Sequence, residues 1–227
     1  GMLIASTVAP RGPRLTDPQR TPIVDGYREG IAAIRRSAPF RALLGVFLLQ
    51  AVATGLMLAG ANYVAVWVMR SDDALIFLFV ALIAPAILFS PIWNAISRRV
   101  GKERAFAAAS IMFSVATASL VGAIWAPGVW MYASVGLAGA AYAGMQALPM
   151  AMLPDVISHD ARISGRSRAG VFGGVWTAGE TTGMAIGAAA LTAILTITGY
   201  RESVAGVDVE QPTEAVTGIA ASFGIVP

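Results

Sequence analysis

Glu180 is the ionisable side chain with the most unusual position, because it lies within a long apolar stretch, 169–200. A carboxyl group at membrane depth is costly to ionise, so it usually faces a cavity or a partner and takes part in function. At 100° per residue, Trp176, Thr177 and Thr181 lie with it within about 140° of a helix surface. This face combines a ring, two hydroxyls and a carboxyl, and it suits a polar solute or a cation. The alternative is a protonated Glu180 that is hydrogen-bonded to a neighbouring helix or lies near a helix end.

Several other polar side chains interrupt apolar stretches and are candidates to line an aqueous path. Taken singly, each is better explained by a hydrogen bond between two helices. The candidates are Asn62, Tyr63, Tyr142 and Gln146, with Gln50 and Asn94 beside them.

A catalytic or metal centre is not indicated. Asp155, His159 and Asp160 have a loosely metal-like spacing, but three arginines follow in the same segment, so ionic pairing explains them better. The sequence has no cysteine and a single histidine, which excludes thiolate and multi-histidine metal sites. Ser158 is adjacent to His159, but adjacency in sequence does not make a nucleophile and its base. We therefore expect no enzyme, no metal and no catalytic residues.

The composition is that of a membrane protein. Hydrophobic residues make up 56% of the 227 residues and charged residues 13%, about half the charged share of an average soluble domain. A soluble core cannot use so much apolar surface, so a single soluble domain is excluded. The net charge of +3 does not indicate nucleic-acid binding, because basic residues also set topology in membrane proteins.

The uncharged stretches predict the membrane-spanning helices, since each span needs about 20 apolar residues. We expect five complete spans and a partial one, with a Pro127–Gly128 turn inside the longest uncharged block. Residues 1–9 resemble the end of a preceding helix, or alternatively a disordered tail, and residues 10–40 form a linker. The bundle then covers 41–227, with spans at about 42–69, 74–97, 105–126, 129–153 and 169–199 and a partial span at 215–227.

Two glycine patterns predict close helix packing. Gly179, Gly183 and Gly187 recur every four residues in the fifth span, and the fourth span repeats the spacing with Gly136, Ala140 and Gly144. Glycines at this spacing allow two helix backbones to approach closely in lipid. We interpret both patterns as packing seams.

The basic residues predict the topology. Fourteen of the 16 lysines and arginines lie in alternate connections, before the first span, between the second and third, and between the fourth and fifth. The opposite connections carry Arg70 and Arg201 among several acidic residues. The positive-inside rule places the basic connections in the cytoplasm, which makes the linker 10–40 cytoplasmic.

Three segments together resemble a known family. The segment 153–168 (LPDVISHDARISGRSR) with 171–176 (VFGGVW) resembles the tenth-to-eleventh helix region of the glycoside–pentoside–hexuronide:cation symporters. This family includes the melibiose permeases and belongs to the major facilitator superfamily. The segments 97–104 (SRRVGKER) and 36–41 (RSAPFR) resemble its basic inner loop and its entry into helix seven. The loop residues that carry the resemblance are Asp155, Arg162, Arg166, Arg168, Arg98, Arg99 and Lys102.

The resemblance implies an all-α, polytopic bundle that is the carboxy-terminal half of a major facilitator. The five complete spans would be helices seven to eleven of twelve, and residues 1–9 and 215–227 would belong to helices six and twelve. Its partners would be the bilayer, a small sugar-like solute and an amino-terminal six-helix half that also holds most of the family's acidic cation site. Thr181 stands where family members commonly carry a lysine.

The implied function is cation-coupled symport of a sugar or glycoside across the cytoplasmic membrane. The coupling cation would be Na⁺ or H⁺, with no other cofactor. Two alternatives stay open on the sequence. The first is a transporter of the same architecture for another solute, such as an organic anion or a lysolipid, and the second is a truncated membrane scaffold that only packs against a partner.

Overall fold

The computed structural model describes residues 31–32, 34–71, 73–165, 168–202 and 210–224. Every regular element among them is helical, which confirms the all-α prediction. The expectations for residues 1–9, for 10–30 of the linker and for Arg166 lie outside the described residues. The helices are α3 (Ala38–Tyr63) with the π-helical turn η1 (Val64–Val68), α4 (Ala74–Val100), α5 (Lys102–Ser119) with the 3₁₀ turn η2 (Leu120–Ile124), α6 (Trp130–Ser164), α7 (Ala169–Ile197) and α8 (Thr213–Gly224).

Four of these segments are long and apolar enough to cross a membrane: α3 with η1, α4, α5 with η2, and α7. The sequence predicted five complete spans, and α6 occupies the place of the remaining one. Its 35 residues are sufficient in length. It is not among the four because alanine, glycine and polar residues make much of it less apolar. The partial span expected at 215–227 corresponds to α8.

The helix α6 continues beyond the expected end of its span at residue 153. Pro154 lies inside it, and the helix ends at Ser164, where Gly165 adopts a left-handed conformation with φ 67°. A proline removes a backbone donor and leaves the carbonyl four residues earlier without its helical partner. That carbonyl belongs to Met150. Lys102, at the start of α5, donates a hydrogen bond from Nζ to the carbonyl of the next residue, Ala151, at 2.9 Å and so joins this part of α6 to a neighbouring helix.

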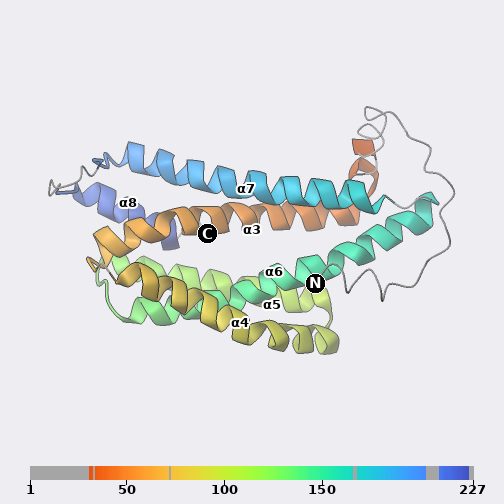
Figure 1. Cartoon of the computed structure of the whole chain (residues 1–227), viewed down its shortest axis with the longest axis horizontal. Coiled ribbons are helices and arrows are strands. Elements are labelled where there is room, and N and C mark those ends of the chain that lie inside the picture. Colours follow the sequence, from red (N-terminus) through yellow and green to blue (C-terminus); the bar gives the residue numbers. More distant parts are fainter. Residues whose placement is uncertain (1–30, 33, 72, 166–167, 203–209, 225–227) are drawn as a thin grey trace, which may run out of the picture.

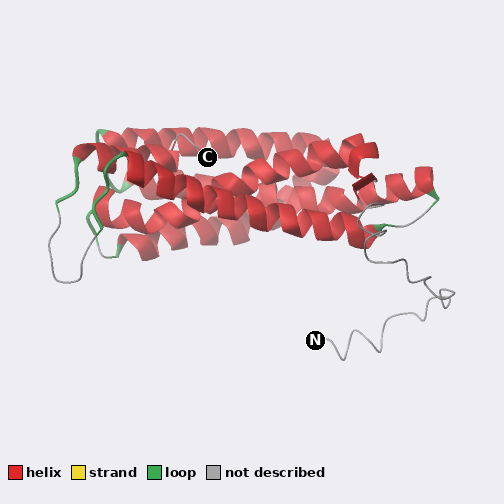
Figure 2. Cartoon of the chain, turned by 90° about the horizontal axis from the view of Figure 1, so that it is seen from above, coloured by secondary structure: helices red, strands yellow, loops and turns green. Residues whose placement is uncertain are grey.

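The helices form two layers that run along the long axis of the molecule. Figure 1 shows α3, α7 and α8 in one layer and α4, α5 and α6 in the other, and Figure 2 shows the same bundle turned by 90°. Within the layers, α3 packs along α7, and α6 packs along α4 and α5. The two layers also meet through α8, which contacts η2.

The two ends of the bundle differ in charge. We call the end that holds the first residues of α3, α5 and α7 and the last residues of α4 and α6 the basic end. It lies at the right of Figure 1, and it carries the arginine-rich connections. The other end is called the opposite end below.

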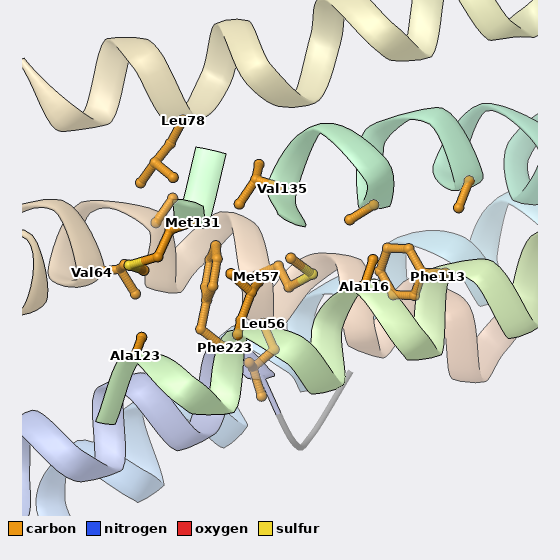
Figure 3. Close-up of a cluster of buried hydrophobic side chains, with 14 of the residues drawn as sticks. Leu56, Met57, Val64, Leu78, Phe113, Ala116, Ala123, Met131, Val135 and Phe223 are labelled. Atoms are coloured by element: carbon orange, nitrogen blue, oxygen red, sulfur yellow. The ribbon is translucent and has the colours of Figure 1, made fainter. Parts of the chain in front are cut away.

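The apolar core joins the layers toward the opposite end (Figure 3). Leu56 and Val64 of the α3–η1 segment are buried there with Met131 of α6 and Phe223 of α8. Small side chains, several of them alanines, complete the same cluster on α5 and α6. Because the buried residues come from both layers, burial of this apolar surface favours their association.

The predicted glycine seam between α3 and α7 is confirmed. A Cβ atom on Gly183 would lie 2.7 Å from the Cβ of Ala51, and one on Gly187 would overlap the main chain at Val52. In the second seam, a Cβ on Gly144 would meet the indole ring of Trp93 at 2.7 Å, but the close backbone approach is at Gly139, where a Cβ would overlap the carbonyl oxygen of Leu82. The pairs α3–α7 and α4–α6 are therefore packed as closely as their backbones allow.

Candidate functional site

A groove of about 760 Å³ lies between the two layers. Phe47 lies nine residues into α3 and Glu180 eleven residues into α7, which places both about 15 Å from the basic end, near the middle of a 30 Å hydrocarbon layer. Four helices therefore meet at mid-depth around this groove. The lining residues are Phe47 of α3, Leu82, Ile83, Ala86, Ile87, Ser90 and Pro91 of α4, Tyr142, Ala143, Gln146, Ala147 and Met150 of α6, and Glu180 of α7.

A small network of polar side chains connects the two layers at the groove. Gln50 of α3 donates a hydrogen bond from Nε2 to Oε1 of Gln146 on α6 at 3.0 Å. The Tyr142 hydroxyl interacts with the side chains of Gln146 and Thr54, and Tyr142 and Glu180 line the same groove. Gln50 is 5% exposed, and its Oε1 has no hydrogen-bond partner in the described structure. The network therefore retains hydrogen-bonding capacity that its own members do not use.

Glu180 is half-buried and faces the groove. No hydrogen bond or ion pair of its carboxyl group occurs within the described part of the chain. The alternative suggested by the sequence, a carboxyl group held by a hydrogen bond to a neighbouring helix, is therefore not what the structure contains. The carboxyl group is exposed to whatever occupies the groove.

Trp176 does not line the groove, although the sequence placed it on the same face as Glu180. Its side chain is 2% exposed and stacks on Phe47 with ring centroids 4.0 Å apart. Phe40 and Phe172 complete an aromatic cluster between α3 and α7. Trp176 therefore supports the ring of Phe47, which itself faces the groove.

The two threonines of the predicted face also lie outside the groove lining. Thr177 and Thr181 are both exposed. The Thr181 hydroxyl donates a hydrogen bond to the Thr177 carbonyl at 2.9 Å, within the same helix. A helical wheel gives the angle between side chains but not the positions of the neighbouring helices, so it could not separate these residues from Glu180.

Asn62 and Tyr63 lie toward the opposite end, away from the groove lining. Asn62 is exposed. The ring of Tyr63 contacts the ring of Tyr200 edge-on, with centroids 5.3 Å apart, and Trp67 donates a hydrogen bond from its indole nitrogen to the Tyr200 hydroxyl at 3.2 Å. These residues join the end of α3 to the segment after α7.

Sequence reasoning missed the contribution of α4 and the position of Phe47. The α4 lining is mostly apolar, and an apolar face toward a groove has the same sequence pattern as one toward lipid. Ser90 followed by Pro91 was a usable signal, since both interrupt an otherwise apolar helix and both line the groove.

Charged residues of the segments that carry the resemblance form three ion pairs within the described part of the basic end. Lys102 pairs with Asp155 at 2.5 Å and thereby joins the start of α5 to α6. Asp160 is 4% exposed and lies 3.4 Å from Arg36 and 3.6 Å from Arg168. Pairing between Asp160 and a following arginine was expected, whereas the contribution of Arg36 was not. Three further arginines of this group, Arg98, Arg99 and Arg162, are exposed.

No group of three or more histidine, aspartate or glutamate side chains is arranged to hold a metal ion among the described residues. The structure thus provides a mid-depth groove with polar groups and an ionic cluster at one end of the bundle.

Apolar helices that surround a mid-depth groove define the class, a polytopic membrane protein of the transporter type. The chain matches the family model for MFS/sugar transport proteins over residues 5–227, and it therefore belongs to that family of the major facilitator superfamily. This result confirms the family resemblance and the expectation that the protein is not an enzyme, because the members of the family are transporters. A search of curated proteins found no match to the sequence.

Proposed function

We propose that the protein carries a sugar or glycoside across the cytoplasmic membrane and couples this transport to Na⁺ or H⁺. The observation that carries the proposal is the groove at mid-depth, with Glu180, Tyr142 and Gln146 in its lining. Transporters of this general type bind their solute near the bilayer midplane, between two repeats that move relative to each other. Membership of the MFS/sugar transport family supports the same class of solute.

The groove would act as one wall of the solute site. Its hydroxyl, amide and carboxyl groups can bind solute hydroxyls, and the Phe47 ring, held by Trp176, offers an aromatic face. The other wall would come from a six-helix amino-terminal half. In this proposal, α4 contributes to the wall together with α3, α6 and α7.

Two of the alternatives from the sequence, an organic anion and a membrane scaffold, receive less support. The described lining residues include one charged group, the Glu180 carboxyl group, and it would repel an organic anion. A membrane scaffold has no need of a half-buried carboxyl group at mid-depth, because such a group is costly unless it has a function.

Uptake into proteoliposomes tests the proposal. The protein from the complete gene is reconstituted, and a panel of labelled sugars and glycosides is offered with and without Na⁺ and H⁺ gradients. We expect at least one neutral sugar or glycoside to accumulate in a gradient-dependent manner. Absence of uptake for the whole panel, with correctly inserted protein, would contradict the proposal.

Glu180→Gln then tests the groove itself. Glutamine keeps the size and hydrogen-bonding capacity of glutamate but removes its charge, so packing changes little. We expect impaired uptake or altered ion dependence with normal membrane insertion. A purely structural interhelical hydrogen bond is worth about 0.6 kcal/mol on average, so its alteration would leave uptake nearly normal. Glu214→Gln, at an exposed position on α8, is the matched control.

A further inference from the structure

The charge and the lining of the groove point to a narrower class of occupant. We propose that the groove binds an amphipathic organic cation: a small solute, glycoside or not, that presents one positively charged nitrogen to Glu180 and an apolar group to α4 and α6. This inference rests on the proposed function in one respect, namely that the solute binds in the groove.

The first observation is an uncompensated charge. Glu180 provides the charged group of the described lining, and within the described residues it has neither an ion-pair partner nor a hydrogen bond. The next residue, Thr181, has a neutral side chain and supplies no counter-charge. Its hydroxyl donates a hydrogen bond to the Thr177 carbonyl of the same helix. A carboxylate in such surroundings is stabilised by an occupant of opposite charge.

The second observation is the apolar α4 side of the groove. It is formed by leucine, isoleucine, alanine and proline side chains with Ser90 among them, and Met150 and two alanines of α6 are also apolar, whereas Tyr142, Gln146 and Glu180 supply the polar groups. A solute with one apolar side fits this lining, because hydroxyls placed against the apolar side would lack partners. An apolar group has no such cost, and the Phe47 ring can interact favourably with an adjacent cation.

The third observation is a small apolar cavity next to the groove. It has a volume of about 70 Å³, and Leu82 and Tyr142 line both the cavity and the groove. Met57, Phe113 and Phe223 contribute to its other walls. An apolar substituent of the occupant can enter this space beyond Tyr142 while the cationic nitrogen stays beside Glu180.

Direct binding to the protein from the complete gene, held in lipid nanodiscs, tests this inference. The probe is labelled phenyltrimethylammonium, and tert-butylbenzene, its uncharged isostere, and benzoate are the competitors. We expect the cation to bind at least about tenfold more tightly than the isostere, as partly buried charge pairs do. Benzoate should not compete.

Variants at one position then assign the charge selectivity. Glu180→Gln should reduce cation affinity to that of the isostere, and Glu180→Asp should retain most of the preference. Glu214→Gln, which removes a carboxylate outside the groove, should bind like the unsubstituted protein. The comparison of cation and isostere needs no variant, so a folding defect in Glu180→Gln leaves the test valid.

Equal affinities for the cation and its isostere would overturn the inference, as would unchanged cation binding in a folded Glu180→Gln variant. Uptake of neutral sugars in the same preparation separates the two proposals. Sugar uptake without cation selectivity would leave the proposed function standing and remove this inference. Cation selectivity without sugar uptake would support the inference and refute the assignment to sugars.

Discussion

Replacement of Gly187 by alanine should weaken the α3–α7 seam. The new Cβ atom would lie 2.6 Å from the Leu56 backbone nitrogen and would overlap the Val52 carbonyl oxygen. Non-bonded heavy atoms approach comfortably at about 3.5 Å, so α7 would have to move away from α3 by about 1 Å. Both opposing atoms belong to the main chain of a helix, and neither can rotate away as a side chain could.

The expected size of the effect follows from two opposing contributions. Overpacking of this kind costs about 1–3 kcal/mol. Exchange of glycine for alanine inside a helix favours the helix by about 1 kcal/mol. The net expectation for Gly187→Ala is therefore a loss of up to about 2 kcal/mol in the free energy of unfolding, and a loss of about 1–3 kcal/mol relative to a glycine-to-alanine exchange that meets no clash. Gly174→Ala is the matched control on the same helix, because nothing lies within 4 Å of its Cβ position, and it should be neutral or slightly stabilising.

Apparent melting temperatures of the purified proteins in one detergent measure the difference. Unfolding of membrane proteins is often irreversible, so all variants are heated at the same rate. We expect Gly187→Ala to melt about 2–12 °C below Gly174→Ala, at about 2–4 °C per kcal/mol for a chain of this length. A Gly187→Ala protein as stable as Gly174→Ala would refute the packing argument. Rescue by Val52→Ala would refute it too, because the clash involves main-chain atoms.

Two further predictions concern the basic end. Asp160→Ala leaves two arginines without their shared counter-charge and should lower the free energy of unfolding by about 1–3 kcal/mol. Asp155→Ala removes one member of an exposed ion pair and should cost at most about 1 kcal/mol. Equal losses of stability for the two variants in thermal melts would contradict this ranking. The sequence has no cysteine, so a single introduced thiol reports topology. A cysteine at Ser164 should resist impermeant thiol reagents in intact cells, and one at Val207 should react, while the reverse pattern would overturn the assignment of the basic end to the cytoplasm.

Most of the helices could be located from the absence of charge, because a charged side chain inside the hydrocarbon layer is expensive. The ends were less predictable. The helix α6 continues through Pro154, and beyond the proline Asp155 and Asp160 pair with basic side chains of other segments. Contacts with distant segments leave no local signal, and a span that was expected to end at residue 153 extends to Ser164.

The candidate site was predictable only where a polar residue interrupts an apolar helix. Glu180, Tyr142 and Gln146 were selected for that reason, and the structure brings all three to one groove. The same reasoning selected Asn62, which does not line the groove. The polarity of a residue does not reveal which other residues it faces. This reasoning also passed over Phe47, because an aromatic ring suits lipid, core and groove equally well.

The groove lies between two layers that are each tightly packed. Within each layer, glycines bring backbones into contact, so separation of α3 from α7 or of α4 from α6 would lose continuous packing. Across the groove, the connections are side-chain interactions such as the Gln50–Gln146 hydrogen bond, and each of these is worth about 0.6 kcal/mol in a membrane. An occupant that offers its own hydrogen bonds or charge to these side chains can replace those interactions at little cost. The half-buried carboxyl group of Glu180 therefore lies where side chains, and not close backbone packing, connect the two layers.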